Sequence, residues 1–157
     1  MKIKNIIFDI GNVLFKWEPD KIMDQLLPGT PHKQEYLDII HSPFWLIEID
    51  KGSFSASELQ KILFDKVNQN PHKLNELNKF ISEFAHYLAP MPQNIELFKK
   101  LFKNGYPLYI LSNFAAESFN KLHQKNSFLN LANGMVISGK VNMVKPEIHI
   151  YKHLLKK

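Results

Sequence analysis

The sequence predicts an α/β fold in which a parallel, doubly wound sheet is interrupted by a block of helices. Three apolar segments of strand type lie at residues 4–9, 106–111 and 135–138. One predicted helix lies between the second and third of these strands, and another follows the third. Strands that alternate with helices favour a parallel sheet. The long stretch after the first strand has helical periodicity throughout, which indicates an all-helical insertion. A chain of 157 residues suits one domain, or a compact domain with a small inserted one.

The helical block contains four predicted helices with clear start and stop signals. Acidic residues and a proline at residues 18–20 favour a helix start there, because acids in the first turn complement the helix dipole. Ser55 and Glu58 have the spacing of a capping box, which predicts that a helix begins just after Ser55. Prolines and polar residues at 28–31 and 68–71 separate the helices. The predicted helices cover residues 18–27, 32–40, 56–67 and 71–87.

The remainder of the chain alternates between helices and strands. Residues 89–92, with two prolines, mark its beginning, and Asn104-Gly105 is a helix stop signal. The continuous apolar run at 106–111 is typical of a buried parallel strand. Helices are predicted at 94–103, 115–125 and 148–157. We therefore divide the chain into a sheet-containing part, residues 1–15 and 89–157, and a helical part, residues 16–88.

Composition excludes several classes of protein. There is no cysteine, so disulfides and thiolate chemistry are absent. The short apolar run behind the N-terminal lysines is broken by Asp9, which argues against an export signal and favours the cytoplasm. No apolar run reaches the ~18 residues of a membrane span. The net charge is +5, but all 20 basic residues are lysines spread along the chain. Because base recognition depends strongly on arginine, we expect no nucleic-acid partner.

Polar side chains follow each of the three predicted strands. Asp9 ends the first strand, Ser112 and Asn113 end the second, and Lys145 follows the third. The ends of parallel strands share one edge of the sheet, so these groups can converge there. A nucleophilic carboxylate, a hydroxyl, an amide and an ammonium group suit a phosphoryl group. Gly11 lets the backbone turn sharply after Asp9, and Asn12 tolerates a turn conformation and can hydrogen-bond locally. Each of these signals taken alone is also typical of an ordinary turn or a solvated charge.

With these residues in place, the sequence resembles the haloacid dehalogenase-like hydrolases, and most closely the sugar-phosphate phosphatases whose first motif reads Phe-Asp-x-Gly-Asn-Val. The first motif is Phe8-Asp9-Ile10-Gly11-Asn12-Val13, the second is Leu111-Ser112-Asn113, and the third is Val144-Lys145-Pro146-Glu147. Residues 45–55 resemble the helical cap of that branch. The resemblance covers essentially the whole chain. It implies a Rossmann-like parallel sheet, here incomplete with about three strands, and an inserted helical cap.

The resemblance also implies a reaction and assigns residues to it. Asp9 and Lys145 would be catalytic, with Asp9 attacking phosphorus to form an aspartyl-phosphate that water then hydrolyses. The phosphate would be bound by residues of all three motifs, namely Ile10, Gly11, Ser112, Asn113 and Lys145. Mg²⁺ would be held by Asp9 and Gly11. The expected partner is a small phosphorylated metabolite, such as a sugar phosphate.

Two departures from the family pattern change these expectations. Most phosphatases of the superfamily have a general acid/base Asp two residues after the nucleophile, where this chain has Gly11. General acid–base help is worth ~10²–10⁴-fold, so slow turnover is expected. The acidic fourth motif, which supplies Mg²⁺ ligands, has no counterpart before Lys157, so we expect a C-terminally truncated chain that binds Mg²⁺ weakly if at all. The first strand would then be an exposed sheet edge, which invites self-association.

Alternatives remain open at this point. One is a catalytically inactive remnant that binds phosphate or a protein. Another is a dehalogenase, disfavoured because dehalogenases of the superfamily hold the halide with an arginine and this chain has none. His149 and His153 are four residues apart on one predicted helix, but surface positions explain them better than a metal site. The aromatic residues Phe44, Trp45 and Phe54 could belong either to the core of the cap or to a substrate site.

Overall fold

A three-stranded parallel sheet forms the centre of the protein, which a computed structural model describes over residues 4–156. The strands are β1 (Ile6–Phe8), β4 (Leu108–Ser112) and β5 (Gly134–Ile137), in the order β1-β4-β5. In β1 Phe8 is in register with Ile110, and Ser112 at the end of β4 is in register with Ile137. The predicted α/β fold, with three parallel strands and a helical insertion, is confirmed, although the ends of the strands differ from the predicted ones by one or two residues.

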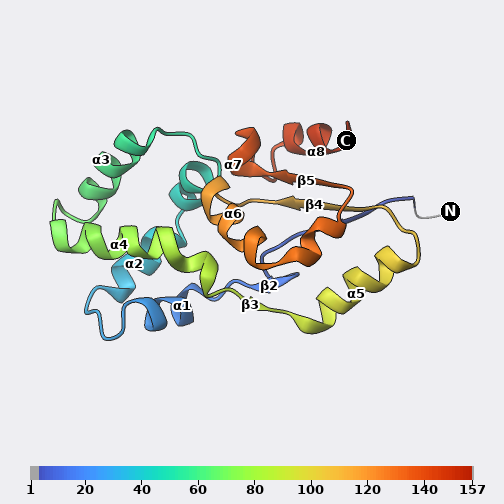
Figure 1. Ribbon diagram of the computed structural model, residues 1–157. Helices are drawn as coiled ribbons and strands as arrows, with labels where there is room; N and C mark the ends of the chain where they lie inside the picture. Colours follow the sequence, from blue (N-terminus) through green and yellow to red (C-terminus); the bar gives the residue numbers. More distant parts are fainter. Residues whose placement is uncertain (1–3, 157) are drawn as a thin grey trace.

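The helical insertion follows β1 and occupies the left half of Figure 1. The chain enters it through β2 (Phe15–Lys16) and leaves it through β3 (Ala89–Pro90), two short strands that pair antiparallel and that the sequence did not predict. They lie beside the predicted boundaries at residues 15 and 89, and the division into two domains stays a prediction. Between them lie α1 (Pro19–Leu26), α2 (Lys33–Ile40), the π-helix η1 (Trp45–Ile49), α3 (Ala56–Lys66), α4 (Pro71–Glu83) and the 3₁₀ turn η2 (Phe84–His86).

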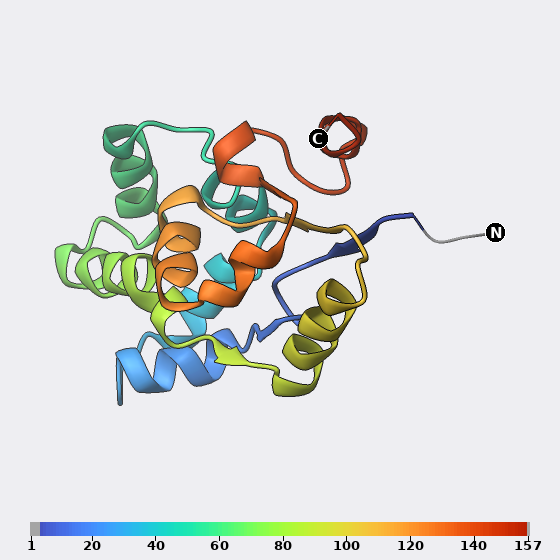
Figure 2. The same cartoon turned by 45° about the vertical axis from the view of Figure 1, so that its right-hand side comes forward.

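Helices cover both faces of the sheet (Figure 2). Helix α5 (Pro92–Lys103) packs on one face, where Phe98 meets the Phe8 ring with centroids 4.9 Å apart. Helix α8 (Ile148–Leu154) packs on the other, against Leu111 and Val136. Successive residues of β4 alternate between these faces, which is why the strand is apolar throughout. The remaining elements are α6 (Ala116–Lys125), the 3₁₀ helix η3 (Ser127–Leu131) and the single turn α7 (Ser138–Val141).

Several local predictions are confirmed. Ser55 accepts a hydrogen bond from the Glu58 amide while the Glu58 carboxylate accepts one from the Ser55 amide, so the capping box is complete. Gly105 ends α5 with a φ of +77°, a conformation that glycine adopts without strain.

The predicted helix over 71–87 is wrong in its last turn, because α4 ends at Glu83 and the chain tightens into η2. The last helix ends at Leu154, and Lys157 lies outside the described residues.

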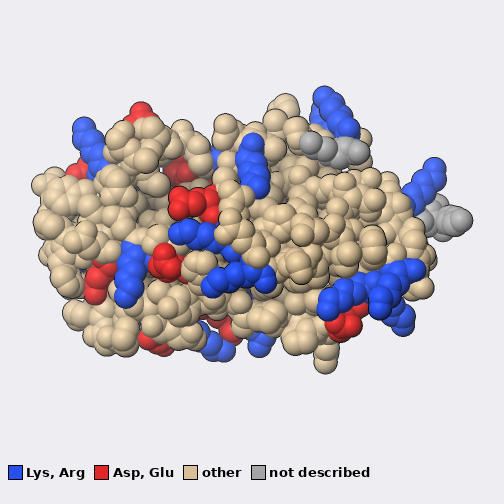
Figure 3. Space-filling model, in the orientation of Figure 1, with Lys and Arg blue, Asp and Glu red and all other residues tan. Residues whose placement is uncertain are grey.

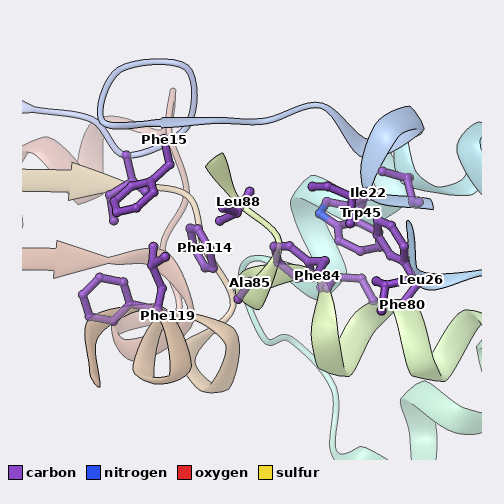
Figure 4. Packing of buried hydrophobic residues seen from close by; sticks show 14 of the residues in the cluster. Phe15, Ile22, Leu26, Trp45, Phe80, Phe84, Ala85, Leu88, Phe114 and Phe119 are labelled. Atoms are coloured by element: carbon purple, nitrogen blue, oxygen red, sulfur yellow. The ribbon is translucent and has the colours of Figure 1, made fainter. Parts of the chain in front are cut away.

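The insertion and the sheet share one hydrophobic core. Phe84, just after α4, lies between Trp45 of the insertion and Phe114 beyond β4 (Figure 4), with ring centroids 5.9 Å and 5.7 Å away respectively. All three rings are at most 7% exposed. Aromatic pairs at such distances add to the stability that burial alone provides. The helical insertion is therefore held against the sheet by packed rings rather than by a flexible contact.

The surface carries charges of both signs, with basic side chains gathered over α5 (Figure 3), whose last turn contains Lys100 and Lys103. Among residues 4–156, none of the helices is both long and apolar enough to cross a membrane. Strand β1 is an edge of the described sheet, and its Ile7 is 51% exposed. Self-association through this edge stays a prediction.

Candidate active site

The predicted polar residues converge at the ends of the parallel strands. Asp9 directly follows β1, Ser112 ends β4, and Lys145 lies in the loop between α7 and α8. The Lys145 ammonium donates to Asp9 Oδ2 at 2.5 Å and to the carbonyl of Leu111 at 3.2 Å. Lys145 thus joins the ends of β1 and β4. These two hydrogen bonds fix the position of the Lys145 ammonium group. An anion that binds at the ends of β1 and β4 would therefore lie close to its positive charge.

The Asp9 carboxylate is held at both oxygens. Oδ1 accepts a hydrogen bond from the Ile10 amide at 2.7 Å, while Oδ2 accepts the bond from Lys145. The Asp9 side chain is 37% exposed and the Lys145 side chain 21% exposed, so the pair is open to solvent and to a ligand. A carboxylate with a fixed orientation and one accessible side is suited to nucleophilic attack.

The turn after Asp9 uses the conformational tolerance predicted for Asn12 and not that predicted for Gly11. The residue with a left-handed backbone is Asn12, with a φ of +56°, and not Gly11. Asn tolerates this conformation because its side chain bonds locally, and Asn12 Oδ1 accepts from the Trp17 amide at 2.9 Å. At Gly11 an added Cβ would meet only Trp17 Cβ at 3.9 Å, an ordinary contact. The sharp turn therefore depends on Asn12.

Asn113 holds the loop that carries Lys145. Its side-chain amide donates to the carbonyl of Lys145 at 3.0 Å, and its Oδ1 accepts from the amide of Lys145 at 2.8 Å. This pair of bonds occupies both ends of the Asn113 amide group. The side chain consequently positions Lys145, and the predicted contact of Asn113 with phosphate stays untested.

A pocket of about 190 Å³ opens where these groups meet. Five of the six predicted site residues line it, namely Asp9, Gly11, Ser112, Asn113 and Lys145. Ile10 does not, because its side chain is fully buried in the core and its amide is bonded to Asp9. The rest of the wall comprises Trp17, Trp45, Asp50, Phe84, Leu88 and Phe114. The pocket therefore has a polar end at the strands and an aromatic wall from the insertion and the loop after β4.

Of the three aromatic residues left open by the sequence, Trp45 lines the pocket. Phe44 packs instead beside Lys66, whose ammonium lies 4.3 Å from the ring centroid, and Phe54 is 39% exposed. Sequence periodicity could not separate these positions, since both core and site residues are apolar on the inner face of the insertion. Their assignment depends on which side chains face β1 and β4.

Asp50 is a site residue that the sequence reasoning missed. It follows the mostly apolar run Trp45–Ile49 and comes just before Lys51-Gly52, so a weaker form of the signal that singled out Asp9 was present here, with Glu48 interrupting the apolar run. Burial raises the pKa of Asp50 to about 7, although hydrogen bonds from the Ala115 amide and the Trp45 side chain oppose the shift. Near neutral pH this carboxyl is therefore partly protonated.

This shift predicts an unusual pH dependence of stability. Because the pKa of Asp50 is higher in the folded protein than its ordinary value of 3.8, the folded state binds the proton more tightly, and stability falls as pH rises from about 4 to about 7. We expect Asp50→Asn, which keeps an oxygen acceptor but no charge, to be more stable than the parent at pH 8 by about 2–4 kcal/mol. Urea unfolding at pH 4.5 and pH 8 measures this. An equal difference at both pH values would contradict it.

The donor set at the strand ends determines how a magnesium ion would fit. Within residues 4–156 no three acidic or histidine side chains cluster as they would around a tightly held metal. Asp9 and Gly11 do lie together on the pocket wall. Mg²⁺ is commonly held by one or two carboxylates, with water and substrate phosphate completing its shell. These residues therefore fit an ion that is held weakly by the protein and more firmly once phosphate is present.

Comparison with known sequences gives distant similarity to two proteins of Aspergillus species. No family model matches the chain. It is 25% identical over 153 residues to the sesquiterpene phosphatase astK of Aspergillus oryzae, a match that covers 98% of this chain and 73% of that protein. It is 23% identical over 162 residues to the drimenol cyclase drtB of Aspergillus calidoustus, covering 98% of this chain but 28% of the cyclase.

Solved structures agree with the fold. A HAD family enzyme of Bacteroides thetaiotaomicron, in complex with magnesium and inorganic phosphate, superimposes with a TM-score of 0.71 at 17% identity, covering 99% of this chain and 78% of that one. The L-2-haloacid dehalogenase of Xanthobacter autotrophicus gives a TM-score of 0.62 at 15% identity, covering 99% and 64% of the two chains. The protein therefore has the fold of the haloacid dehalogenase-like hydrolases, and its sequence is distantly similar to that of a sesquiterpene phosphatase.

Proposed function

We propose that the protein is a phosphomonoesterase that works through an aspartyl-phosphate on Asp9. The observation that carries the proposal is the Asp9–Lys145 pair at the tips of β1 and β4, inside a pocket that also presents Ser112. A carboxylate oriented at both oxygens can attack, and a fixed ammonium stabilises negative charge on a phosphoryl group. Distant similarity to a sesquiterpene phosphatase supports the same chemistry.

In the proposed reaction, an oxygen of Asp9 bonds to phosphorus while the bond to the substrate alcohol breaks. Lys145 and the Ser112 hydroxyl offset the charge on the phosphoryl oxygens, and Asn113 keeps Lys145 in place. Water then attacks the same phosphorus, which releases inorganic phosphate and regenerates the Asp9 carboxylate. Mg²⁺, when bound beside Asp9 and Gly11, supplies charge neutralisation that lets one anion approach another.

The pocket also favours one kind of substrate alcohol. The apolar part of its wall consists of Trp17, Trp45, Phe84, Leu88 and Phe114. A sugar placed there would lose hydrogen bonds from its hydroxyls to water, at a cost of ~1–3 kcal/mol for each one left unpaired. We therefore propose a phosphate ester of a small apolar or aromatic alcohol, whereas the first motif resembles that of sugar-phosphate phosphatases. A cavity of about 150 Å³ accepts benzene, so a pocket of about 190 Å³ suits a compact ligand.

The test is phosphate release by the purified chain from phenyl phosphate and from glucose 1-phosphate, each with Mg²⁺ and with EDTA. We expect hydrolysis that requires Mg²⁺ and a kcat/KM at least about tenfold higher for phenyl phosphate, because only that alcohol leaves no hydroxyl unpaired. A preference for glucose 1-phosphate would overturn the apolar substrate but keep the phosphatase. No release from either ester by a folded sample would leave the alternative, an inactive module that binds phosphate or a protein.

A further inference from the structure

We infer that Asp50 is the general acid that protonates the leaving alcohol, a role that Gly11 cannot perform. The inference rests on the proposed phosphatase function. Asp50 comes from the helical insertion, whereas Asp9 and Lys145 belong to the sheet-containing part, and all three line the same small pocket. In about 190 Å³ one compact ester fills the space, so its phosphoryl group and its alcohol contact both ends of the wall.

The π-helical turn η1 holds the backbone that carries the Asp50 side chain. The Asp50 amide donates to the carbonyl of Trp45 at 2.9 Å, the wide spacing of a π-helix, so the two residues stand about one turn apart and both reach the pocket. The Ser138 hydroxyl, at the start of α7, donates to the carbonyl of Asp50 at 2.6 Å. Asp50 is therefore anchored from both parts of the molecule, as a proton donor must be if it is to meet a bound substrate.

The surroundings of Asp50 favour a carboxyl group that still carries its proton near neutral pH. Burial raises its pKa to about 7, in the range where a carboxyl can give a proton to an alkoxide and take one back from water. The charged residues that share its pocket, Asp9 and Lys145, neutralise each other at 2.5 Å. Its neighbour Lys51 is paired with Glu147 at 3.0 Å, which lowers the pKa of Glu147 instead.

Charged groups on the other elements near Asp50 are also engaged. On α6, Lys121 lies 3.5 Å from Glu117 and 3.7 Å from Glu83. On α7, the Lys140 ammonium lies 4.8 Å from the ring centroid of Phe119. On η1 itself the charged residue is Glu48. Burial raises the pKa of Asp50 and two hydrogen bonds oppose that rise, and no charged partner contributes to it.

The proposed step balances in protons and bonds. As Asp9 attacks, the ester P–O bond breaks and its electron pair stays on the leaving oxygen, which takes the proton of the Asp50 carboxyl and departs as an alcohol. The Asp50 carboxylate then removes a proton from the water that attacks the aspartyl-phosphate. Asp50 is protonated again, phosphate is released, and the enzyme returns to its starting state.

Leaving-group dependence tests this role. p-Nitrophenolate leaves without a proton, whereas the alkoxide of an alkyl phosphate requires one. We expect Asp50→Asn to lose a few-fold in kcat/KM on p-nitrophenyl phosphate and roughly 10²–10⁴-fold in kcat/KM on isopentyl phosphate. The ratio kcat/KM is the measure here because it reports the attack on the ester and not the later hydrolysis of the aspartyl-phosphate, which both esters share. In the parent, kcat/KM for isopentyl phosphate should fall as pH rises above about 7, because the protonated form is the active one, and this limb should vanish in Asp50→Asn. Asp65→Asn, at an exposed acid on α3, is the matched control and should behave as the parent does.

Each result decides the matter. An equal loss of kcat/KM on both esters in Asp50→Asn, with the pH limb retained, would show that Asp50 only supports the structure and would overturn the inference. An unchanged rate on isopentyl phosphate would overturn it as well. If the parent hydrolyses p-nitrophenyl phosphate, the proposed function stands whatever Asp50 does, and if it hydrolyses neither ester, both proposals fail together.

Discussion

Asp9→Asn is expected to lose at least about 10⁴-fold in phosphate release, the largest effect of any single substitution in the pocket. The amide has the size and shape of the carboxylate, but its oxygen is too weak a nucleophile to attack phosphorus. It also loses the charge that Lys145 faces at 2.5 Å. Because the Asp9 side chain is 37% exposed, water can solvate an unpaired Lys145, and we expect little change in thermal stability.

The measurement has two parts. Steady-state release from p-nitrophenyl phosphate gives the rate, and intact mass spectrometry after rapid acid quench gives the fraction of chains carrying one phosphoryl group. The parent should show that fraction, and Asp9→Asn should not. Asp24→Asn, an exposed acid on α1 that pairs with Lys33, is the control and should retain both. A phosphoryl group still present on Asp9→Asn would identify a different nucleophile.

Gly139→Ala is expected to destabilise the protein by about 3 kcal/mol, at the upper end of the range for overpacking. A Cβ on Gly139 would lie 2.4 Å from the amide nitrogen of Ala115 and 3.0 Å from the carbonyl oxygen of Phe114. Both are backbone atoms, so no side chain can rotate away. The Gly139 amide also donates to the Phe114 carbonyl at 3.1 Å, and that bond would be distorted. Since this loop continues from Ser112 and Asn113, we expect phosphatase activity to fall together with stability.

Chemical denaturation of Gly139→Ala beside Gly11→Ala separates a steric effect from a general effect of replacing glycine. At Gly11 an added Cβ meets one atom at 3.9 Å and the backbone has no left-handed φ, so we expect a change below about 0.5 kcal/mol. Equal stability of the two variants would show that α7 can move away from the loop after β4. The positive-φ glycine Gly105 is a poorer control, because alanine there is strained by the backbone itself.

The sequence by itself determined the sheet-containing part and the position of its reactive edge. Local signals gave the capping box at Ser55 and the stop at Gly105. The three motif residues Asp9, Ser112 and Lys145 could be placed together because parallel strands end at the same edge, whatever their exact bounds. What these signals share is that a few neighbouring residues, or the direction of a strand, suffice to determine them.

The tertiary structure alone decided which residues complete the pocket. Asp50 and Trp45 are about 40 residues from Asp9, and their approach depends on how the insertion packs through Phe84 and on the Ser138 hydroxyl, contacts that no local pattern encodes. The same holds for Asn113, whose side chain bonds to the backbone of Lys145, 32 residues away. Periodicity gives the inner face of a helix, but only the packed core determines what that face meets.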